Sequence, residues 1–477
     1  MPSRHVLLKD AEPPALREGL RQLRAGLGVP GDFTAEVQVE AERAAANPVL
    51  PERDCTDIEF VTVDPETSTD LDQAFHLSRI GEGYLLRYAI ADVAAFVAPG
   101  RSLDAETHRR GETLYAPTRK IPLHPAVLSE GAASLLPGQV RPALVWELSL
   151  DAAGELTSAT VERGLVRSRA KLSYTGAQAD LDAGRGGEQL ELLRTIGRLR
   201  QAIEVRRGGV SLSVPEQEVV ATDSHWELAY RATLPVEDWN AQLSLATGMA
   251  AAGLMLKAGV GILRTLPPAK DGSVAKLRRT ASALGIAWPH AMGYPEFVRS
   301  LSASVPAHAA MLNACTLLFR GAGYQAFDGT APEQPFHAAI AAPYAHTTAP
   351  LRRLVDRYSG ETCVAIGAGR PGPDWVAAAL PQLPAVMDEA DRRAKKYERG
   401  TIDLVEAMVL APRLGQTFTG TVLEVDTEDD YGVLQLADPA VEGRVKGADL
   451  VLGEQIPATL VAADLVAGRV EFRVLKP

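Results

Sequence analysis

Cysteine is scarce in this chain, and no two cysteines have the spacing of a metal-binding or redox motif. Cys55, Cys315 and Cys363 are the only three among 477 residues, and they lie far apart. This pattern argues against a structural zinc site or a disulfide framework, and it fits a reducing compartment. The sequence also lacks a GxGxxG fingerprint and a Walker loop, the usual signs of dinucleotide and P-loop sites. We expect no small-molecule cofactor.

Long apolar runs and an excess of positive charge are also missing. The longest apolar run, residues 243–256, is too short to span a membrane and ends at Lys257. The first ten residues lack the apolar core of a signal peptide, so we expect a cytoplasmic protein with no membrane partner. The net charge of −11 argues against nonspecific coating of nucleic acid, so any RNA or DNA must bind to local basic patches.

The most informative segment that is present is 63–73, with the sequence VDPETSTDLDQ after an apolar, β-prone run. Asp70 and Asp72 are two residues apart, so in extended chain their side chains point to one face. The proline and the Thr/Ser run before them predict a turn that folds Asp64 back toward that face. Clustered carboxylates repel unless a cation lies between them, and oxygen ligands suit magnesium or manganese. The segment indicates a metal site for phosphoryl chemistry; the alternatives are a polar turn or a structural calcium loop.

The pattern of the chain changes twice. Residues 1–50 carry two short helical patterns around a Gly/Pro-rich break, which predicts a helix-turn-helix-like unit or a helical cap on the main domain. Residues 51–411 mix strand and helix patterns and end in a long helix over 384–411, whereas 412–477 carry short, closely spaced strands that fit an OB barrel. The predicted fold class is α+β. Before the long helix, strands are expected at 58–63, 73–80, 84–97, 143–151 and 156–166, and helices at 186–207, 236–257, 273–284 and 305–320.

Three further segments make the acidic segment specific. They are YAIADVAAFVAPG from Tyr88, the stretch 103–136 with GETLY and IPLHP, and YAHTTAPLRRLVD from Tyr344. In this order they resemble the mixed α/β catalytic (RNB) domain of the ribonuclease II family, and 418–474 resembles that family's all-β, C-terminal S1-type OB domain. The family usually carries two cold-shock domains before the catalytic domain. We expect the short helices of residues 1–50 in their place.

The resemblance implies a processive 3′→5′ exoribonuclease that hydrolyses single-stranded RNA to nucleoside 5′-monophosphates with a divalent metal, magnesium or else manganese. Asp64, Asp70 and Asp72 match three of the family's four acidic positions, and Gln73 stands where the fourth is normally aspartate. A Gln carbonyl can ligate magnesium but brings no charge, so we expect one of two metal ions to bind more weakly. Arg352 fills the arginine position of the family's Ser-Pro-Ile-Arg motif and is expected to grip the scissile phosphate. The predicted catalytic residues are Asp70, Asp72 and Arg352, and the predicted metal ligands are Asp64, Asp70, Asp72 and Gln73.

The same resemblance implies contacts to RNA. Tyr115 matches the family tyrosine that packs on the terminal nucleotide, where stacking contributes about 1–3 kcal/mol for any base; a half-buried core tyrosine is the alternative. Arg353 is expected to hold a neighbouring phosphate. Glu237 and Asp238 resemble an acidic pair near the RNA 3′ end, where a 2′-OH can be read, and the sequence does not choose between them. Asp92 lies inside an apolar strand and is expected to be a structural hydrogen-bond hub.

Other interpretations stay open at this point. Gln73 allows a non-catalytic RNA-binding relative, and nothing in the motifs excludes a nuclease that also accepts DNA. For Arg352 the alternative is a structural ion pair, with Asp356 as the candidate partner. We expect the partner to be the 3′ end of single-stranded RNA and the protein to be a monomer.

Overall fold

The part of the molecule that carries the acidic segment is a five-stranded closed barrel. The computed structural model describes residues 14–116, 119–212, 216–221, 226–231, 233–302, 305–319, 321–426 and 430–475. The barrel strands are β1 (Phe60–Asp64), β2 (Gln73–Ile80), β3 (Gly83–Ala91), β6 (Val140–Leu150) and β7 (Leu156–Ser173). Neighbouring strands are antiparallel, except that β1 and β7 pair in parallel and close the barrel.

The sequence predicted these five strands, with two differences in length. The expected strand 84–97 ends at Ala91, because Asp92 leads into the short 3-10 helix η1 (Val93–Ala95). Strand β7 runs to Ser173, beyond the expected end at 166, and its last residues pair with β1. This extension holds the end of β1 in place, so it positions the acidic segment that follows.

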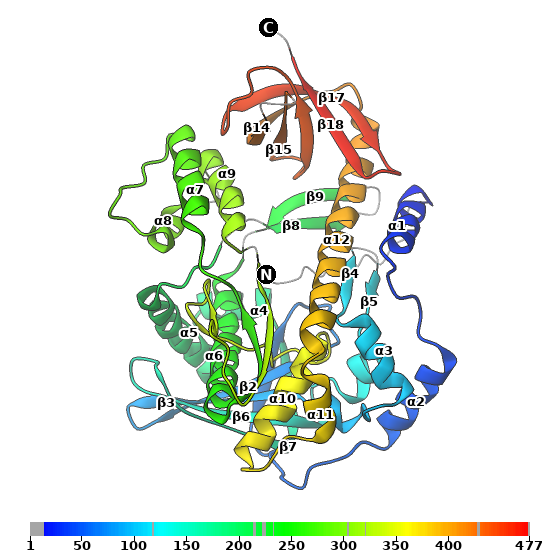
Figure 1. Cartoon of the computed structure of the whole chain (residues 1–477), viewed down its shortest axis with the longest axis vertical. Coiled ribbons are helices and arrows are strands. Elements are labelled where there is room, and N and C mark those ends of the chain that lie inside the picture. Colours follow the sequence, from blue (N-terminus) through cyan, green and yellow to red (C-terminus); the bar gives the residue numbers. More distant parts are fainter. Residues whose placement is uncertain are drawn as a thin grey trace.

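Helices cover the barrel and bring a second set of side chains to it (Figure 1). The helices α5 (Gly187–Arg207) and α6 (Pro235–Ala258) pack closely on each other, and α10 (Leu354–Gly367) contacts β7 and α6. At the crossing of α5 and α6, a Cβ on Gly197 would lie 2.4 Å from the Trp239 Cβ, so only glycine fits there. Helix α6 is buried along most of its length, as its apolar composition predicted.

A long helix, α12 (Leu383–Leu410), leads to a second closed barrel at the C-terminal end, shown in red and brown in Figure 1. This barrel has the strand order β14-β15-β16-β18-β17. The predicted long helix and small barrel are both confirmed. The strands are β14 (Thr417–Asp426), β15 (Tyr431–Leu436), β16 (Glu442–Lys446), β17 (Gln455–Asp464) and β18 (Arg469–Val474).

The two N-terminal helices, α1 (Pro14–Gly26) and α2 (Ala35–Ala46), pack on different parts of the molecule. Leu16 and Leu20 of α1 share a core with α12 and the C-terminal barrel. Helix α2, capped by Thr34, instead packs on α3 (Ser102–Arg110) and on the core of the first barrel. This arrangement favours the helical cap over a helix-turn-helix unit that reads nucleic acid.

Helix α9 (Pro306–Cys315) continues as a 3-10 turn, so the expected helix 305–320 is split in two.

Within the ranges that the structure describes, no helix has both the length and the apolar character needed to cross a membrane.

The remaining elements are short. These elements are β4 (Leu114–Ala116), β5 (Arg119–Ile121), η2 (Leu128–Ala132), α4 (Tyr174–Asp182), β8 (Glu216–Ala221), β9 (Trp226–Arg231), β10 (Val260–Thr265), α7 (Asp271–Ala283), α8 (Tyr294–Ser300), α9 (Pro306–Cys315), η3 (Thr316–Phe319), β11 (Gly323–Asp328), β12 (Phe336–His337), β13 (Ala342–Pro343), α11 (Asp374–Ala379) and η4 (Ala411–Arg413).

Candidate active site

The predicted acidic residues lie together on the connection between β1 and β2, which we call the acidic loop (residues 64–73). Asp64 is the last residue of β1 and Gln73 is the first of β2. These two strands are antiparallel neighbours, so the two ends of the loop lie side by side. Asp70 influences the ionisation of both Asp64 and Asp72. The structure therefore brings the three predicted carboxylates into one site.

Bonds from two sides fix the acidic loop. Ser134 Oγ accepts a hydrogen bond from the Leu71 amide at 2.9 Å and donates to the Thr69 carbonyl at 2.7 Å. On the other side, Lys171 Nζ donates to the carbonyls of Glu66 and Ser68, both at 2.6 Å. The side chain of Leu71 is fully buried. The carboxylates are thus held by the fold and do not depend on a ligand for their position.

The ionisation of these carboxylates indicates a place for a cation. Burial raises the pKa of Asp64 to about 7, against the opposing effects of Arg352 and Lys171. Burial also raises the pKa of Asp72 to about 8, although Arg352 and the Leu351 amide favour its charged form. A nearby cation stabilises an ionised carboxylate. Asp64 and Asp72 therefore have the chemistry of ligands for a divalent ion.

The arginine motif lies directly against the acidic loop, on residues 349–353, which we call the arginine loop. The Leu351 amide donates to Asp72 Oδ1 at 2.7 Å, and Arg352 Nε lies 3.7 Å from Asp72 Oδ2. A third of the Arg352 side chain is exposed. The predicted catalytic arginine and the predicted catalytic aspartate therefore meet in the structure.

Two buried residues hold the arginine loop in this position. Asp356 Oδ1 accepts from the Ala349 amide at 2.7 Å, and Arg353 forms a two-point ion pair with Asp356 at 2.9 and 3.0 Å. The ion pair considered for Arg352 thus belongs to Arg353. His124, from the IPLHP segment, lies 3.1 Å from the Leu351 carbonyl through Nδ1. Burial lowers the pKa of His124 to about 4, so at neutral pH the uncharged ring donates this bond.

Tyr115 borders the same site. It lies on β4 and is half-buried. Burial raises the pKa of its hydroxyl, and Arg352, Asp70 and Asp72 all act on that pKa. Tyr115 therefore lies beside the predicted catalytic groups.

Sequence reasoning missed Lys120, which also reaches the acidic loop. Lys120 is paired with Tyr115 across the β4–β5 hairpin. Its Nζ lies 3.2 Å from Asp70 Oδ1 and 2.6 Å from Glu130 Oε1. The one local signal was the position of Lys120 next to the IPLHP segment. Because Lys120 is far from Asp70 in the sequence, no local pattern indicated that the two side chains meet.

The amide of Gln73 is bonded to side chains of β3 and α6. Its Oε1 accepts a hydrogen bond from the Tyr88 hydroxyl and another from Ser244 Oγ at 3.2 Å. Ser244 Oγ also contacts Thr348 Oγ1 at 3.0 Å. The carbonyl expected to ligate a metal is therefore already the acceptor of two hydroxyl groups, and both would have to rearrange for it to do so.

The structure separates the two acidic residues at the start of α6. Glu237 accepts the Leu234 amide at 3.2 Å and pairs with Arg231 at 2.6 Å. It shares a helix stripe with Asn240, whose amide lies 3.5 Å from the Val63 carbonyl at the end of β1. Asp238 is exposed on another face. Of the pair, Glu237 lies on the side of the helix that faces the acidic loop.

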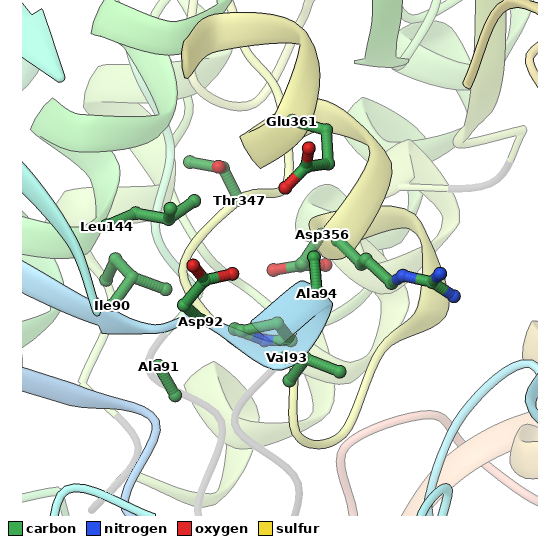
Figure 2. Close-up of a pocket in the computed structure, with 11 residues that line it drawn as sticks. Ile90, Ala91, Asp92, Val93, Ala94, Leu144, Thr347, Asp356 and Glu361 are labelled. Carbon is green, nitrogen blue, oxygen red and sulfur yellow. The ribbon is translucent and has the colours of Figure 1, made fainter. Parts of the chain in front are cut away.

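Asp92 is the structural hub that the sequence predicted. It is 2 % exposed and accepts from Arg163 Nε at 2.7 Å, and Arg163 also pairs with Glu361 of α10. Figure 2 shows the carboxylates of Asp92, Asp356 and Glu361 around a small cavity. Its volume of about 10 Å³ has room for one water. This network joins the barrel to the helix that follows the arginine loop.

The carboxylates do not form a ready-made metal cage. Among the residues described, no group of three or more His, Cys, Asp or Glu side chains is arranged to hold a metal ion. Asp70 faces Lys120, and one oxygen of Asp72 accepts the Leu351 amide. Asp64 and Asp72 supply carboxylate oxygens, the donors that magnesium and manganese prefer.

Comparison with known families decides the classification. The family model of the RNB domain matches residues 52–359, the part of the chain that holds both loops. The chain belongs to the RNB-domain family. The model of the RNase II-type exonuclease C-terminal S1 domain matches residues 416–475. Both parts of the resemblance seen in the sequence are confirmed.

Individual relatives show the same two-part architecture around the RNB domain. The chain is 24% identical to Ribonuclease R of Escherichia coli over 501 residues, which cover 92% of this chain and 60% of that protein. The RNase R of Mycoplasma genitalium, solved with ribose-methylated single-stranded RNA, superposes with a TM-score of 0.86 at 20% identity, covering 97% of this chain and 78% of that one. Yeast Ssd1, described as a pseudonuclease, gives a TM-score of 0.68 at 19% identity, with 90% and 53% covered. The chain spans about half the length of the curated relatives it matches.

Proposed function

We propose that this protein is a processive 3′→5′ exoribonuclease that hydrolyses single-stranded RNA to nucleoside 5′-monophosphates. The observation that carries the proposal is the contact of the acidic loop with the arginine loop, at Asp72 and Arg352. Carboxylates that favour a cation beside an arginine that favours phosphate form the arrangement that phosphodiester hydrolysis needs. Membership of the RNB-domain family and the RNase R fold support the same activity.

The roles of the side chains follow from their positions. A bound divalent metal ion supplies positive charge to phosphate oxygens and lowers the pKa of a coordinated water. Asp64 and Asp72 would hold this ion, and their oxygen-only set suits magnesium, with manganese as the other candidate. Arg352 binds the scissile phosphate and stabilises the negative charge that develops on it. Asp70, which lies between Asp64 and Asp72 on the loop, completes the acidic cluster and is paired with Lys120.

The substrate is held by groups around this centre. Tyr115 stacks on a terminal base without regard to its identity. Glu237 is favoured over Asp238 as the acceptor of a ribose 2′-OH, because it shares a helix stripe with Asn240. Arg353 acts through Asp356 to orient the arginine loop and does not itself bind phosphate.

The proposed division of the chain places the N-terminal helical segment at 1–50, the RNB catalytic domain at 51–411 and the S1-type domain at 412–477. We assign the protein to the cytoplasm, and the three buried, free cysteines support a reducing compartment. RNA with a single-stranded 3′ end is the proposed partner of a monomer.

One observation favours a second candidate, an RNA-binding protein without nuclease activity. Gln73 brings no charge, and its oxygen is engaged by Tyr88 and Ser244. A time course on a denaturing gel with 5′-labelled RNA separates the two candidates. An exoribonuclease converts the labelled RNA to short end products in magnesium and is inactive in excess EDTA, whereas a binding protein retards RNA on a native gel and leaves its length unchanged. A DNA strand of the same sequence, run in parallel, tests whether the ribose is required.

A further inference from the structure

The ammonium group of Lys120 lies beside a carboxylate of the acidic loop, as a bound cation would. Its side chain is 15% exposed, and its Nζ lies between Asp70 Oδ1 at 3.2 Å and Glu130 Oε1 at 2.6 Å. Lys120 is on β5 and Glu130 on the short helix η2, so the contact joins three separate segments. A partly buried ammonium between two carboxylates is held much more firmly than an exposed surface pair.

The opposite side of the acidic loop is closed to a second cation for a different reason. The Oε1 of Gln73 accepts from Tyr88 and Ser244. The ring of Tyr88 is fully buried in the barrel core, and Ser244 also contacts Thr348. An amide held by these groups has no lone pair directed at an ion in the site. The two other predicted ligands, Asp70 and Gln73, thus each already have a partner.

The charges agree with this geometry. Relative to a loop with four aspartates, Gln73 removes one negative charge. The ammonium of Lys120, bound to Asp70, adds one positive charge. Together these two differences equal the charge of one divalent ion. A second ion would have to approach Asp70 against the charge of Lys120, part of which Glu130 offsets, and this repulsion weakens its binding unless water screens it.

We propose that Lys120 occupies Asp70 in place of a second metal ion, so that the acidic loop binds a single divalent ion through Asp64 and Asp72. Lys120 is then a positioning residue, because it acts through Asp70. The inference rests on the proposed function, in which the loop serves a metal-dependent reaction. It also gives the neutral Gln73 a place in an active enzyme, since the missing charge is matched by a cation of the chain itself.

The test counts manganese ions on the intact protein without RNA, by the loss of the free-ion electron paramagnetic resonance signal. We expect one ion on the wild type. Lys120→Met should add a second ion, or tighten manganese binding by about tenfold or more, since a cation beside Asp70 is removed. Lys120→Arg keeps the charge and should bind as the wild type does. Lys276→Met, at an exposed position on α7, is the matched control and should change nothing.

Two results would overturn the inference. One is a wild type that binds two ions or none; the other is a Lys120→Met protein that binds manganese no more tightly and no more abundantly than the wild type. A purely structural role for Lys120 predicts weaker binding in the variant, the opposite of our expectation. Because the ions are counted without hydrolysis, failure to shorten RNA would refute the proposed exoribonuclease while the count still decides the role of Lys120.

Discussion

Metal binding by the acidic loop should depend steeply on pH between 6 and 9. A divalent ion binds the ionised forms of Asp64 and Asp72, whose pKa values are raised by burial to about 7 and about 8. Below those values each carboxyl must lose a proton before it can serve as a ligand. Affinity should therefore fall as the pH falls, and the window is set by these two groups.

The size of the effect follows from the two pKa values. At pH 6 about one tenth of Asp64 and about one hundredth of Asp72 are ionised, so the competent form is about a thousandfold rarer than at pH 9. The apparent magnesium affinity should drop by the same factor, about 4 kcal/mol. Isothermal titration at several pH values measures the affinity, and repeating it in buffers of different ionisation enthalpy counts the protons released.

The control for this prediction is Asp72→Asn, which removes the more strongly shifted group. Its affinity is weaker at every pH, but its pH dependence should shrink to the tenfold range that Asp64 alone gives. A wild-type affinity that stays constant from pH 6 to 9 would show that both carboxyls are ionised without metal. That result would refute the raised pKa values and the pH dependence that follows from them.

Three further changes test separate parts of the structure. Asp72→Asn should abolish cleavage on a denaturing gel while RNA retardation stays within about twofold, because an asparagine oxygen still accepts the amide of the arginine loop; equal cleavage by the variant and the wild type would contradict the assignment. Tyr115→Ala should change the length of the final RNA fragment, because the stacking ring is lost; Tyr115→Phe keeps the ring and is the control. If Tyr115→Ala and the wild type give identical end products, Tyr115 only packs in the core. Gly197→Ala should destabilise the protein by about 1–3 kcal/mol in thermal melting, because the new methyl meets Trp239 at 2.4 Å. Gly253→Ala on α6, with no atom within 4 Å, is the matched control and should be neutral or stabilising.

Local patterns predicted the elements that have one buried face. The middle of β7 alternates in burial, and α12 has a stripe of buried residues, so period and length were enough to place these two elements. Helix α10 was not predicted because it is buried on every side and has no stripe to read. Its polar residues find partners far away in the chain: Arg357 pairs with Asp104, and Glu361 with Arg163.

Contacts between residues far apart in the chain also limited what the sequence predicted of the site. The acidic loop is continuous in the sequence, so its carboxylates and the departure at Gln73 are visible there. Lys120, Tyr88 and Ser244 reach the loop from β5, β3 and α6. Their contacts depend on how the barrel closes and how α6 packs on it, which no local pattern contains. The role of the arginine loop was predicted from the family resemblance. A family motif carries information about long-range contacts, which composition and hydrophobic periodicity lack.

The position of Gln73 argues for a retuned site over a lost one. Consecutive residues of an extended chain point to opposite faces, and here Asp72 faces the arginine loop while Gln73 faces Tyr88 and Ser244. Gln73 and Asp72 therefore have different partners, and the bond between Asp72 and the Leu351 amide does not involve Gln73. A site that had lost its function would have no need for the bonds of Ser134 and Lys171 that fix the loop. The neutral amide is accommodated by the hydroxyl groups of Tyr88 and Ser244, and the contact of Asp72 with the arginine loop stays intact.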